Sequence, residues 1–112
     1  MKGVDKVSGF IKVFADNVSV AGQTDYKGRQ ERKVTVAYSG TQGASSVFTA
    51  FLVDSDGNEY PLSGVRVSGD LDMITSAKPG EVVEYTKPSG LTMRVKFTKP
   101  SGGTVSAKAT LM

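Results

Sequence analysis

An eight-residue pattern occurs twice in this chain, twelve residues apart, and it constrains the fold more than any other feature. The copies run from Val83 to Gly90 and from Val95 to Gly102, and both end in Lys-Pro-Ser-Gly. Each copy is an alternating stretch followed by a turn with proline at its second position and glycine at its fourth. Two strands that end in the same turn predict consecutive hairpins, and therefore a C-terminal three-stranded meander. The spacing is too short for a solenoid or propeller repeat.

The two turns also predict a register for the strands beside them. When Pro-Ser-Gly forms each loop, Val83 faces Val95, and Glu84 falls opposite Arg94 as a favourable cross-strand ion pair. One face of this sheet is rich in threonine and lysine, and the other is apolar and must be buried against a second layer. The predicted apolar face consists of Val83, Tyr85, Leu91, Met93, Val95, Phe97, Val105, Ala107, Ala109 and Leu111.

Strand signals recur through the earlier part of the chain. The alternation of Val34, Val36 and Tyr38 with polar residues predicts a half-buried strand. The stretch Val47–Val53 is apolar on both faces, so we expect it in the middle of the structure. Residues 21–33 are polar and are expected to form a connection.

The dipeptide Asp56-Gly57 predicts a hairpin between two of these strands. A type I′ turn requires positive φ at both central residues, and Asp-Gly is one of the pairs that best adopt it. This turn would place Val53 opposite Tyr60. Pro61 cannot donate a hydrogen bond to a neighbouring strand, so the return strand is expected at a sheet edge.

The composition narrows both the fold and the chemistry. A chain of 112 residues is long enough for one domain, residues 1–112. The chain has no cysteine and no histidine, which removes disulfides, thiolate nucleophiles, the usual general base and the commonest metal ligand. We therefore expect no cofactor and no enzymatic activity. The predicted fold is all-β: a two-sheet antiparallel β-sandwich of Ig-like or jelly-roll style, with the C-terminal meander.

Five residues form a candidate partner-contact segment: Tyr26, Lys27, Arg29, Arg32 and Lys33. Four cations beside a tyrosine can attract an acidic protein surface or phosphates. The same segment can also be a solvated loop and a charged strand start that discourages edge pairing. Nucleic acid is disfavoured, because the net charge is only +3 and nucleic-acid binders combine a larger basic excess with exposed aromatic side chains.

Two acidic segments are candidate sites. Residues 54–58 superficially resemble a calcium loop, but Gly57 stands at the fourth position and Val65 at the twelfth, where an EF-hand requires glutamate. A tight turn accounts for this segment. Asp70 and Asp72 could share a strand face, as in a glycoside hydrolase acid pair. Two acids on a solvated edge are the simpler interpretation, since catalysis requires burial that separates their pKa values.

A small sandwich without cysteine, histidine or a secretory leader resembles the small β-domains that tailed phages use for head decoration, head–tail connection or tail structure. The resemblance is one of style and composition across the whole chain. It implies a non-enzymatic structural protein of the virion, such as a capsid decoration or stabilising protein, with a tail or head–tail connector as an alternative. It further implies that the partners are other virion subunits and copies of the chain itself. The N-terminal segment or residues 21–33 would then lie on a neighbouring chain.

A carbohydrate-binding or adhesive module is the second interpretation. It requires an exposed aromatic platform, for which Tyr26, Tyr38 and Tyr60 are the candidates. The start of the chain has no apolar leader region, and no apolar run reaches the ~18 residues that a membrane helix needs. We therefore expect synthesis in the host cytoplasm and no membrane partner, and the resemblance to phage proteins implies localisation in the virion.

Overall fold

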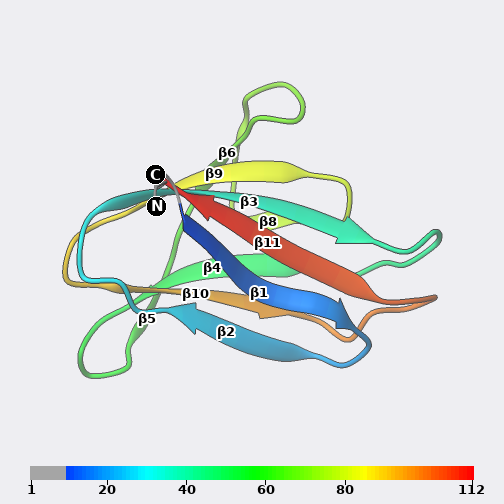
Figure 1. Cartoon of the computed structure of the whole chain (residues 1–112), viewed down its shortest axis with the longest axis horizontal. Coiled ribbons are helices and arrows are strands. Elements are labelled where there is room, and N and C mark those ends of the chain that lie inside the picture. The colour runs from blue at the N-terminus through cyan, green and yellow to red at the C-terminus, as the bar shows by residue number, and fades with distance from the viewer. Residues whose placement is uncertain (1–9) are drawn as a thin grey trace, which may run out of the picture.

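The computed structural model describes residues 10–112, which form eleven strands in two antiparallel sheets (Figure 1). The predicted two-sheet sandwich is confirmed. Sheet A contains, in spatial order, β1 (Phe10–Val18), β11 (Val105–Leu111), β3 (Arg32–Gly40), β9 (Val82–Lys87), β6 (Gly64–Arg66) and β7 (Met73–Ile74). Sheet B contains β2 (Gly22–Tyr26), β10 (Thr92–Phe97), β4 (Phe48–Val53) and β5 (Glu59–Pro61), and β8 (Ser76–Ala77) also pairs with β4.

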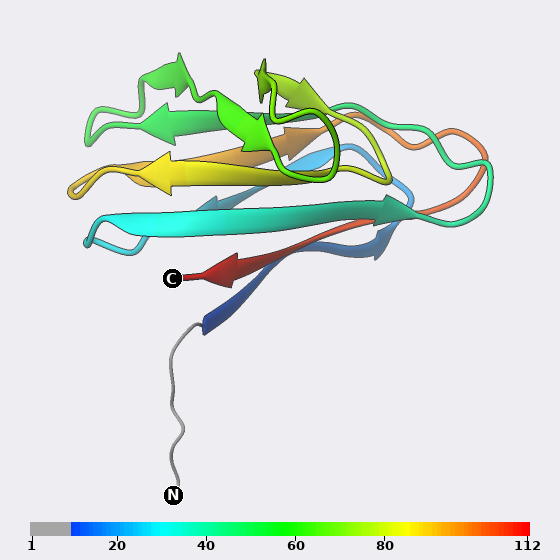
Figure 2. The same cartoon turned by 90° about the horizontal axis from the view of Figure 1, so that it is seen from above.

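The strand order identifies the jelly-roll form of sandwich. β1 pairs with β11, β2 with β10, β3 with β9 and β4 with β5. This is a long antiparallel ribbon folded over on itself, which is how an eight-stranded jelly roll is wound. The short strands β6, β7 and β8 are inserted between β5 and β9. The loops between strands gather at two ends of the molecule, as Figures 1 and 2 show.

The predicted C-terminal meander is wrong, although its three strands exist. β10 belongs to sheet B, while β9 and β11 belong to sheet A and are separated there by β3. The two Lys-Pro-Ser-Gly segments therefore carry the chain from one sheet to the other instead of closing hairpins. Their local conformation is as expected, with Gly90 and Gly102 both at φ +83°. The predicted pairing of these strands is wrong because, in a sandwich, the same turn can connect strands of opposite sheets as well as neighbouring strands of one sheet.

The predicted apolar face survives this correction, because alternation decides only which side chains point inward. Nine of its ten residues are buried, and Leu91 is half-buried. They lie on the facing inner surfaces of two sheets instead of on one sheet. The buried hydrophobic residues are Phe14, Ala15, Val34, Val36, Tyr38, Phe48, Ala50, Val53, Ala77, Val83, Tyr85, Met93, Val95, Phe97, Val105, Ala107, Ala109 and Leu111.

The polar segment at residues 21–33 contains a strand that the sequence did not predict. β2 pairs along its whole length with β10, and Thr24 and Tyr26 are half-buried while Gln23 is exposed. The inward position of Thr24 is tolerated because its hydroxyl donates a 2.7 Å hydrogen bond to the Phe14 carbonyl on β1. Because the inward residue Thr24 is polar, the sequence of β2 does not show the alternation of apolar and polar residues that marks a strand.

The predicted hairpin at Asp56-Gly57 is confirmed, but its register differs by one residue. Val53 pairs with Glu59 instead of with Tyr60. Of the two central residues only Gly57 has positive φ, so the turn is not type I′. The Asp54 carboxylate accepts hydrogen bonds from the backbone nitrogens of Asp56 and Asn58, which favours a longer loop. β5 ends at Pro61 on the edge of sheet B, as expected.

A pair of tyrosines supplies the polar contact at the centre of the core. The hydroxyls of Tyr38 and Tyr85 are 2.8 Å apart and both side chains are buried. The Tyr38 ring also stacks on Phe48 of sheet B, with ring centroids 4.4 Å apart. This pair therefore links neighbouring strands of sheet A and holds them against sheet B. Burial raises the pKa of Tyr38 well above its ordinary value and the pKa of Tyr85 to about 12.

Removing the hydroxyl of either tyrosine alone should lower the free energy of unfolding by more than half of the loss caused by removing both hydroxyls. Tyr38→Phe or Tyr85→Phe leaves one buried hydroxyl without its partner, and we expect a loss of about 1–3 kcal/mol in the free energy of unfolding. The double variant removes both polar groups and should lose less than the sum of the two single losses. Urea denaturation of the four proteins measures this coupling. Strictly additive losses would contradict it.

The same pair predicts alkaline destabilisation. Both folded-state pKa values lie above the unfolded value near 10, so the folded state holds these protons more tightly. Their contribution to stability is complete below about pH 10 and is lost as the pH rises towards 12. The free energy of unfolding should fall over this interval in the parent and fall less in Tyr38→Phe/Tyr85→Phe. Parallel pH profiles for the two proteins would show that the tyrosines are not responsible.

Candidate partner-binding surface

An ion network covers the outer surface of sheet B. The Arg94 guanidinium donates to both oxygens of Asp25, at 2.7 and 3.0 Å, and to Glu59 at 2.8 Å. Lys96 donates to the other Glu59 oxygen at 2.8 Å, and its ammonium lies 5.0 Å from the centroid of the Phe51 ring. The network links β2, β10 and β5 across β4. It replaces the predicted Glu84–Arg94 pair, which cannot form because Glu84 lies in sheet A.

The network also shifts the titration of its members. Hydrogen bonding to Arg94 holds the pKa of Asp25 below its ordinary value, and hydrogen bonds from Lys96 and Arg94 do the same for Glu59. The hydrogen bonds from Asp25 and Glu59 in turn raise the pKa of Arg94. Asp25, Glu59 and Arg94 are therefore charged at neutral pH, and the two carboxylates offset the guanidinium. The network stabilises the alignment of β2, β10 and β5 in sheet B. Its groups with shifted pKa values are not suited to transfer a proton near pH 7.

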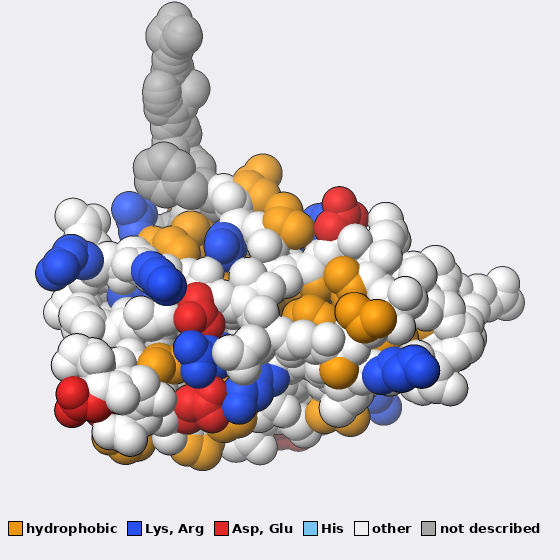
Figure 3. Space-filling model, turned by 90° about the horizontal axis from the view of Figure 1, so that it is seen from below, with side chains coloured by type: hydrophobic (Ala, Val, Ile, Leu, Met, Phe, Trp, Pro, Cys, Tyr) orange, Lys and Arg blue, Asp and Glu red, His pale blue; other side chains and the backbone are white. Residues whose placement is uncertain are grey.

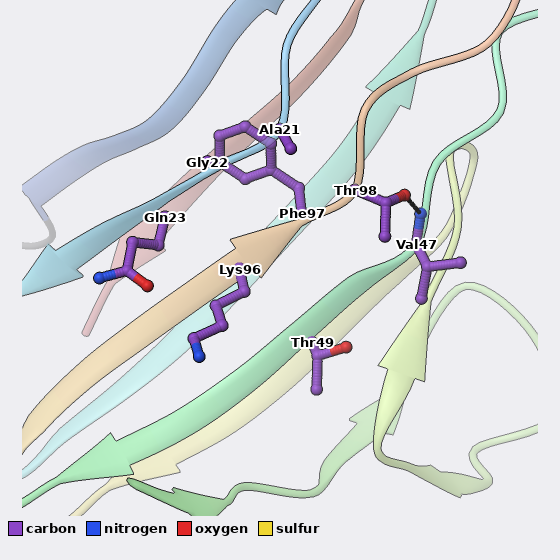
Figure 4. Close-up of a pocket in the computed structure, with 8 residues that line it drawn as sticks. All are labelled: Ala21, Gly22, Gln23, Val47, Thr49, Lys96, Phe97 and Thr98. Atoms are coloured by element: carbon purple, nitrogen blue, oxygen red, sulfur yellow. Dashed lines mark hydrogen bonds between the residues drawn. The ribbon is translucent and has the colours of Figure 1, made fainter. Parts of the chain in front are cut away.

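A hollow of about 500 Å³ opens beside this network, at the end of sheet B where β2 begins. Figure 4 shows its lining residues on three strands and their adjoining loops. Gly22 leaves the hollow open to Phe97, since a Cβ at Gly22 would lie 3.1 Å from that ring. Lys96 stands at its polar side, and the Val47 nitrogen donates a 2.9 Å hydrogen bond to the Thr98 hydroxyl. We name this the sheet B hollow; it is lined by Ala21, Gly22, Gln23, Val47, Thr49, Lys96, Phe97 and Thr98.

The sheet B hollow was not predicted. Its members are scattered over three segments of the chain, and only the pairing of β10 with both β2 and β4 brings them together. The side of the molecule where β2 lies carries intermixed basic and acidic side chains next to hydrophobic ones (Figure 3). Val47 lines the hollow and Val20 lies one residue before it, and both are exposed. These two apolar residues are the feature of the sequence that could have indicated the hollow.

The five residues of the candidate partner-contact segment differ in exposure. Tyr26 faces inward from the end of β2 and packs against the core. Lys27 and Arg29 are exposed in the following loop, whereas Arg32 is half-buried and Lys33 is exposed at the start of β3. The structure thus leaves Lys27, Arg29 and Lys33 exposed, whereas Tyr26 turns inward and Arg32 is partly covered. Whether any of the five contacts a partner stays a prediction.

Lys27 and Arg29 lie beside the first Lys-Pro-Ser-Gly turn. The Gly90 nitrogen donates a 2.8 Å hydrogen bond to the Arg29 carbonyl. A depression of about 260 Å³ forms where this loop meets the β4–β5 and β9–β10 turns. We name this end of the sandwich the basic rim; its depression is lined by Lys27, Gly28, Arg29, Ser55, Gly90, Leu91 and Thr92.

The two copies of the repeated turn have different roles. Lys87 is completely buried, and its ammonium donates to the Pro88 and Leu91 carbonyls at 2.8 and 3.0 Å. Burial and the nearby positive charge of Arg32 lower the pKa of Lys87. Lys87 is therefore a structural cap of its own turn and does not belong to an exposed tip. Lys99, its counterpart at the opposite end of the sandwich, is exposed.

Asp70 and Asp72 do not form an acid pair for catalysis. Both are exposed, and both lie close to one guanidinium, since Arg66 contacts Asp70 at 2.9 Å and Asp72 at 3.4 Å. The hydrogen bond from Arg66 lowers the pKa of Asp70, whereas a general acid requires a raised value. Within residues 10–112, no group of three or more metal-ligating side chains is arranged to hold an ion.

The three candidate stacking tyrosines are placed differently. Tyr38 is buried and Tyr26 packs against the core, so neither presents an open ring. Tyr60 is half exposed at the edge of sheet B, where its hydroxyl donates to Asp54 at 3.1 Å. The residues predicted to contact a neighbour through the N-terminal segment, residues 1–9, lie outside the described part of the chain. No helix in the described range is long and apolar enough to cross a membrane.

Solved structures that share this fold include those of two prophage proteins. The chain superposes on the SPBc2 prophage-derived protein YomS with a TM-score of 0.75 and 16% identity, over 98% of this chain and 99% of YomS. It superposes on the PBSX exported protein XepA with a TM-score of 0.75 and 23% identity, over 97% of this chain. The chain spans only 39% of the length of XepA. No protein-family model and no curated protein matches the sequence.

The ion network predicts a dependence of stability on acidic pH. The folded-state pKa of Asp25 lies below its unfolded value, so this carboxylate stabilises the fold above about pH 4. That stabilisation should be lost as the pH falls through the lowered pKa. Asp25→Asn should therefore be less stable than the parent at pH 7 and should lose less stability on acidification. Urea midpoints between pH 7 and pH 2 measure this, with Asp16→Asn as an exposed control.

Proposed function

We propose that this chain is a non-enzymatic structural protein of a phage virion, and that its specific role is capsid decoration or stabilisation. The observation that carries the proposal is the fold shared, over nearly the whole of both chains, with the SPBc2 prophage-derived protein YomS. The second structural neighbour, XepA, is named as an exported protein of PBSX. A jelly roll is also an architecture that viral capsid domains use repeatedly.

The chemistry of the described surface supports a role in binding rather than in catalysis. Asp25, Glu59, Asp70 and Asp72 all contact arginine, and hydrogen bonds lower the pKa values of Asp25, Glu59 and Asp70. The buried tyrosine pair has raised pKa values and is enclosed in the core. A protein built for assembly requires instead a rigid scaffold with distinct surface patches, as the basic rim and the sheet B hollow provide.

The partners in this proposal are other virion subunits and further copies of the chain. Lys27 and Arg29 at the basic rim would meet an acidic surface on a neighbouring subunit, because exposed charges steer such encounters. A carbohydrate-binding role is the second candidate. It is favoured by Tyr60, whose exposed ring lies beside the Asp54 carboxylate. One aromatic side chain is a smaller platform than such modules usually present.

Purified particles test the proposal directly. Phage particles from cells that carry the coding sequence would be isolated on a density gradient and probed with gold-labelled antibody against the recombinant chain. We expect label on the capsid surface. Label on the tail or at the head–tail junction would instead establish the connector alternative, and particles free of the protein would contradict the virion role.

Charge reversal at the basic rim tests its part in the contact. Lys27→Glu/Arg29→Glu should lower binding to particles that lack the protein by roughly tenfold at low salt, because two steering charges are inverted. The difference from the parent should narrow at high salt, where exposed charges are screened. The matched control is Lys99→Glu/Lys108→Glu, which makes the same charge change away from this rim. Equal losses in both variants would show that only net charge matters.

A further inference from the structure

The insert between β5 and β9 is fixed to the sandwich at both of its ends. The Leu62 nitrogen donates a 3.0 Å hydrogen bond to the Ala50 carbonyl on β4, and the Gly80 nitrogen donates a 2.8 Å bond to the Tyr38 carbonyl on β3. The insert is therefore anchored to sheet B where it begins and to sheet A where it ends. We name residues 63–79, between these two anchors, the strap. It contains β6, β7 and β8 and lies on the side of the sandwich opposite to β1 (Figure 2).

The strap covers one strand edge in each sheet with very little pairing. β6 pairs with β9 at only two positions, and β8 pairs with β4 at only two. These short ladders lie along the side of β9 that faces away from β3 and along the first part of β4. An uncovered strand edge presents unpaired backbone groups to other chains. The strap therefore keeps both edges from pairing with another chain.

The strap contributes little to the hydrophobic core. Within residues 63–79 only Gly64 and Ala77 are buried. Gly64 lies directly on the core, since a Cβ there would come within 2.5 Å of the Val83 side chain and 2.7 Å of the Tyr85 ring. Ile74 packs against the core but is only partly buried. A segment with few buried apolar contacts opens at a lower free-energy cost than the core does.

A single carboxylate, that of Glu81, holds the two arms of the strap together. Its Oε2 atom accepts a 2.8 Å hydrogen bond from Nη1 of Arg66 in β6, and its Oε1 atom accepts a 3.0 Å bond from the Lys78 nitrogen near the end of the strap. Glu81 is itself fixed to sheet A, because its carbonyl accepts a 2.9 Å bond from the Tyr38 nitrogen. Its carboxylate thus joins the first arm and the last arm of the strap to the rigid sheet through charge-assisted hydrogen bonds.

We propose that the strap opens and closes as one unit on the folded sandwich, and that Glu81 is the clasp that holds it closed. Arg66 extends the closure into the loop between β6 and β7, where it binds Asp70 at 2.9 Å and Asp72 at 3.4 Å. Opening detaches β6 from β9 and β8 from β4, while both anchors stay in place. Pairing of these two edges with another chain is then conditional on release of the clasp.

Hydrogen exchange of single backbone amides, followed by NMR, tests the clasp. The Arg66 and Val67 nitrogens donate to the carbonyls of Asp72 and Val82, and we expect both amides to exchange at least a hundredfold faster than those of β3. Glu81→Gln keeps the shape of the side chain but removes its charge. This variant should speed exchange in the strap roughly tenfold and leave β3 and β11 unchanged.

The matched control is Glu84→Gln, which removes a half-buried carboxylate from β9 itself. It should leave exchange in the strap unchanged. Strap amides that exchange as slowly as those of β3, or an equal acceleration by both variants, would overturn the proposal.

A disulfide tests whether the strap moves as one unit. Thr49 on β4 and Ser76 on β8 are paired directly, so Thr49→Cys/Ser76→Cys can be oxidised in a chain that has no other cysteine. Oxidation should slow exchange several-fold at Arg66 and Val67, in the other arm, relative to the reduced form of the same protein. Slowing that is confined to the residues beside position 76 would show that the two arms open independently and would refute the proposal. This comparison stays decisive even if Glu81→Gln fails to fold.

Discussion

The structure depends on the burial of alternating side chains between two sheets that the chain visits in turn. β9, β10 and β11 follow one another in sequence but lie in sheets A, B and A. The buried Val95 therefore points into the core from sheet B, whereas Val83 and Val105 point into it from sheet A. Each crossing requires a tight turn at the end of the sandwich, which the Lys-Pro-Ser-Gly segments provide. The ribbon of paired strands can form only because these crossings alternate.

Polar contacts then fix the positions of elements that the apolar core leaves open. Inside, the hydroxyl pair of Tyr38 and Tyr85 joins β3 and β9. Outside, Arg94 binds acids from β2 and β5 and so aligns three strands of sheet B. At one end, buried Lys87 ties its turn together through two carbonyls. These groups are satisfied within the chain, so they hold the scaffold that carries the basic rim and the sheet B hollow.

The candidate surfaces could be predicted from sequence only where they are continuous in the chain. Lys27 and Arg29 stood out as a run of charge, and both are exposed at the rim. The sheet B hollow depends on β2. This strand could not be predicted from the sequence, because its inward position 24 is a threonine and not an apolar residue. In the loop between β6 and β7, the sequence drew attention only to Asp70 and Asp72; the positive φ and the exposure of Leu71 between them came from the structure. Surfaces made by distant segments leave no local pattern.

The sequence alone determined the all-β class of fold, the inward side chains of β3, β9, β10 and β11, and the turns at both Lys-Pro-Ser-Gly segments and at Asp56-Gly57. Those properties follow from period-two alternation and from glycine and proline at turns, which act over a few residues. Only the tertiary structure decided which strands pair, because Val83 is equally well buried beside Val95 or across from it. The repeated turn is compatible with both arrangements, and packing of the whole core selects the crossing. For the same reason Lys87 became a buried cap while Lys99, in the same motif, remained exposed.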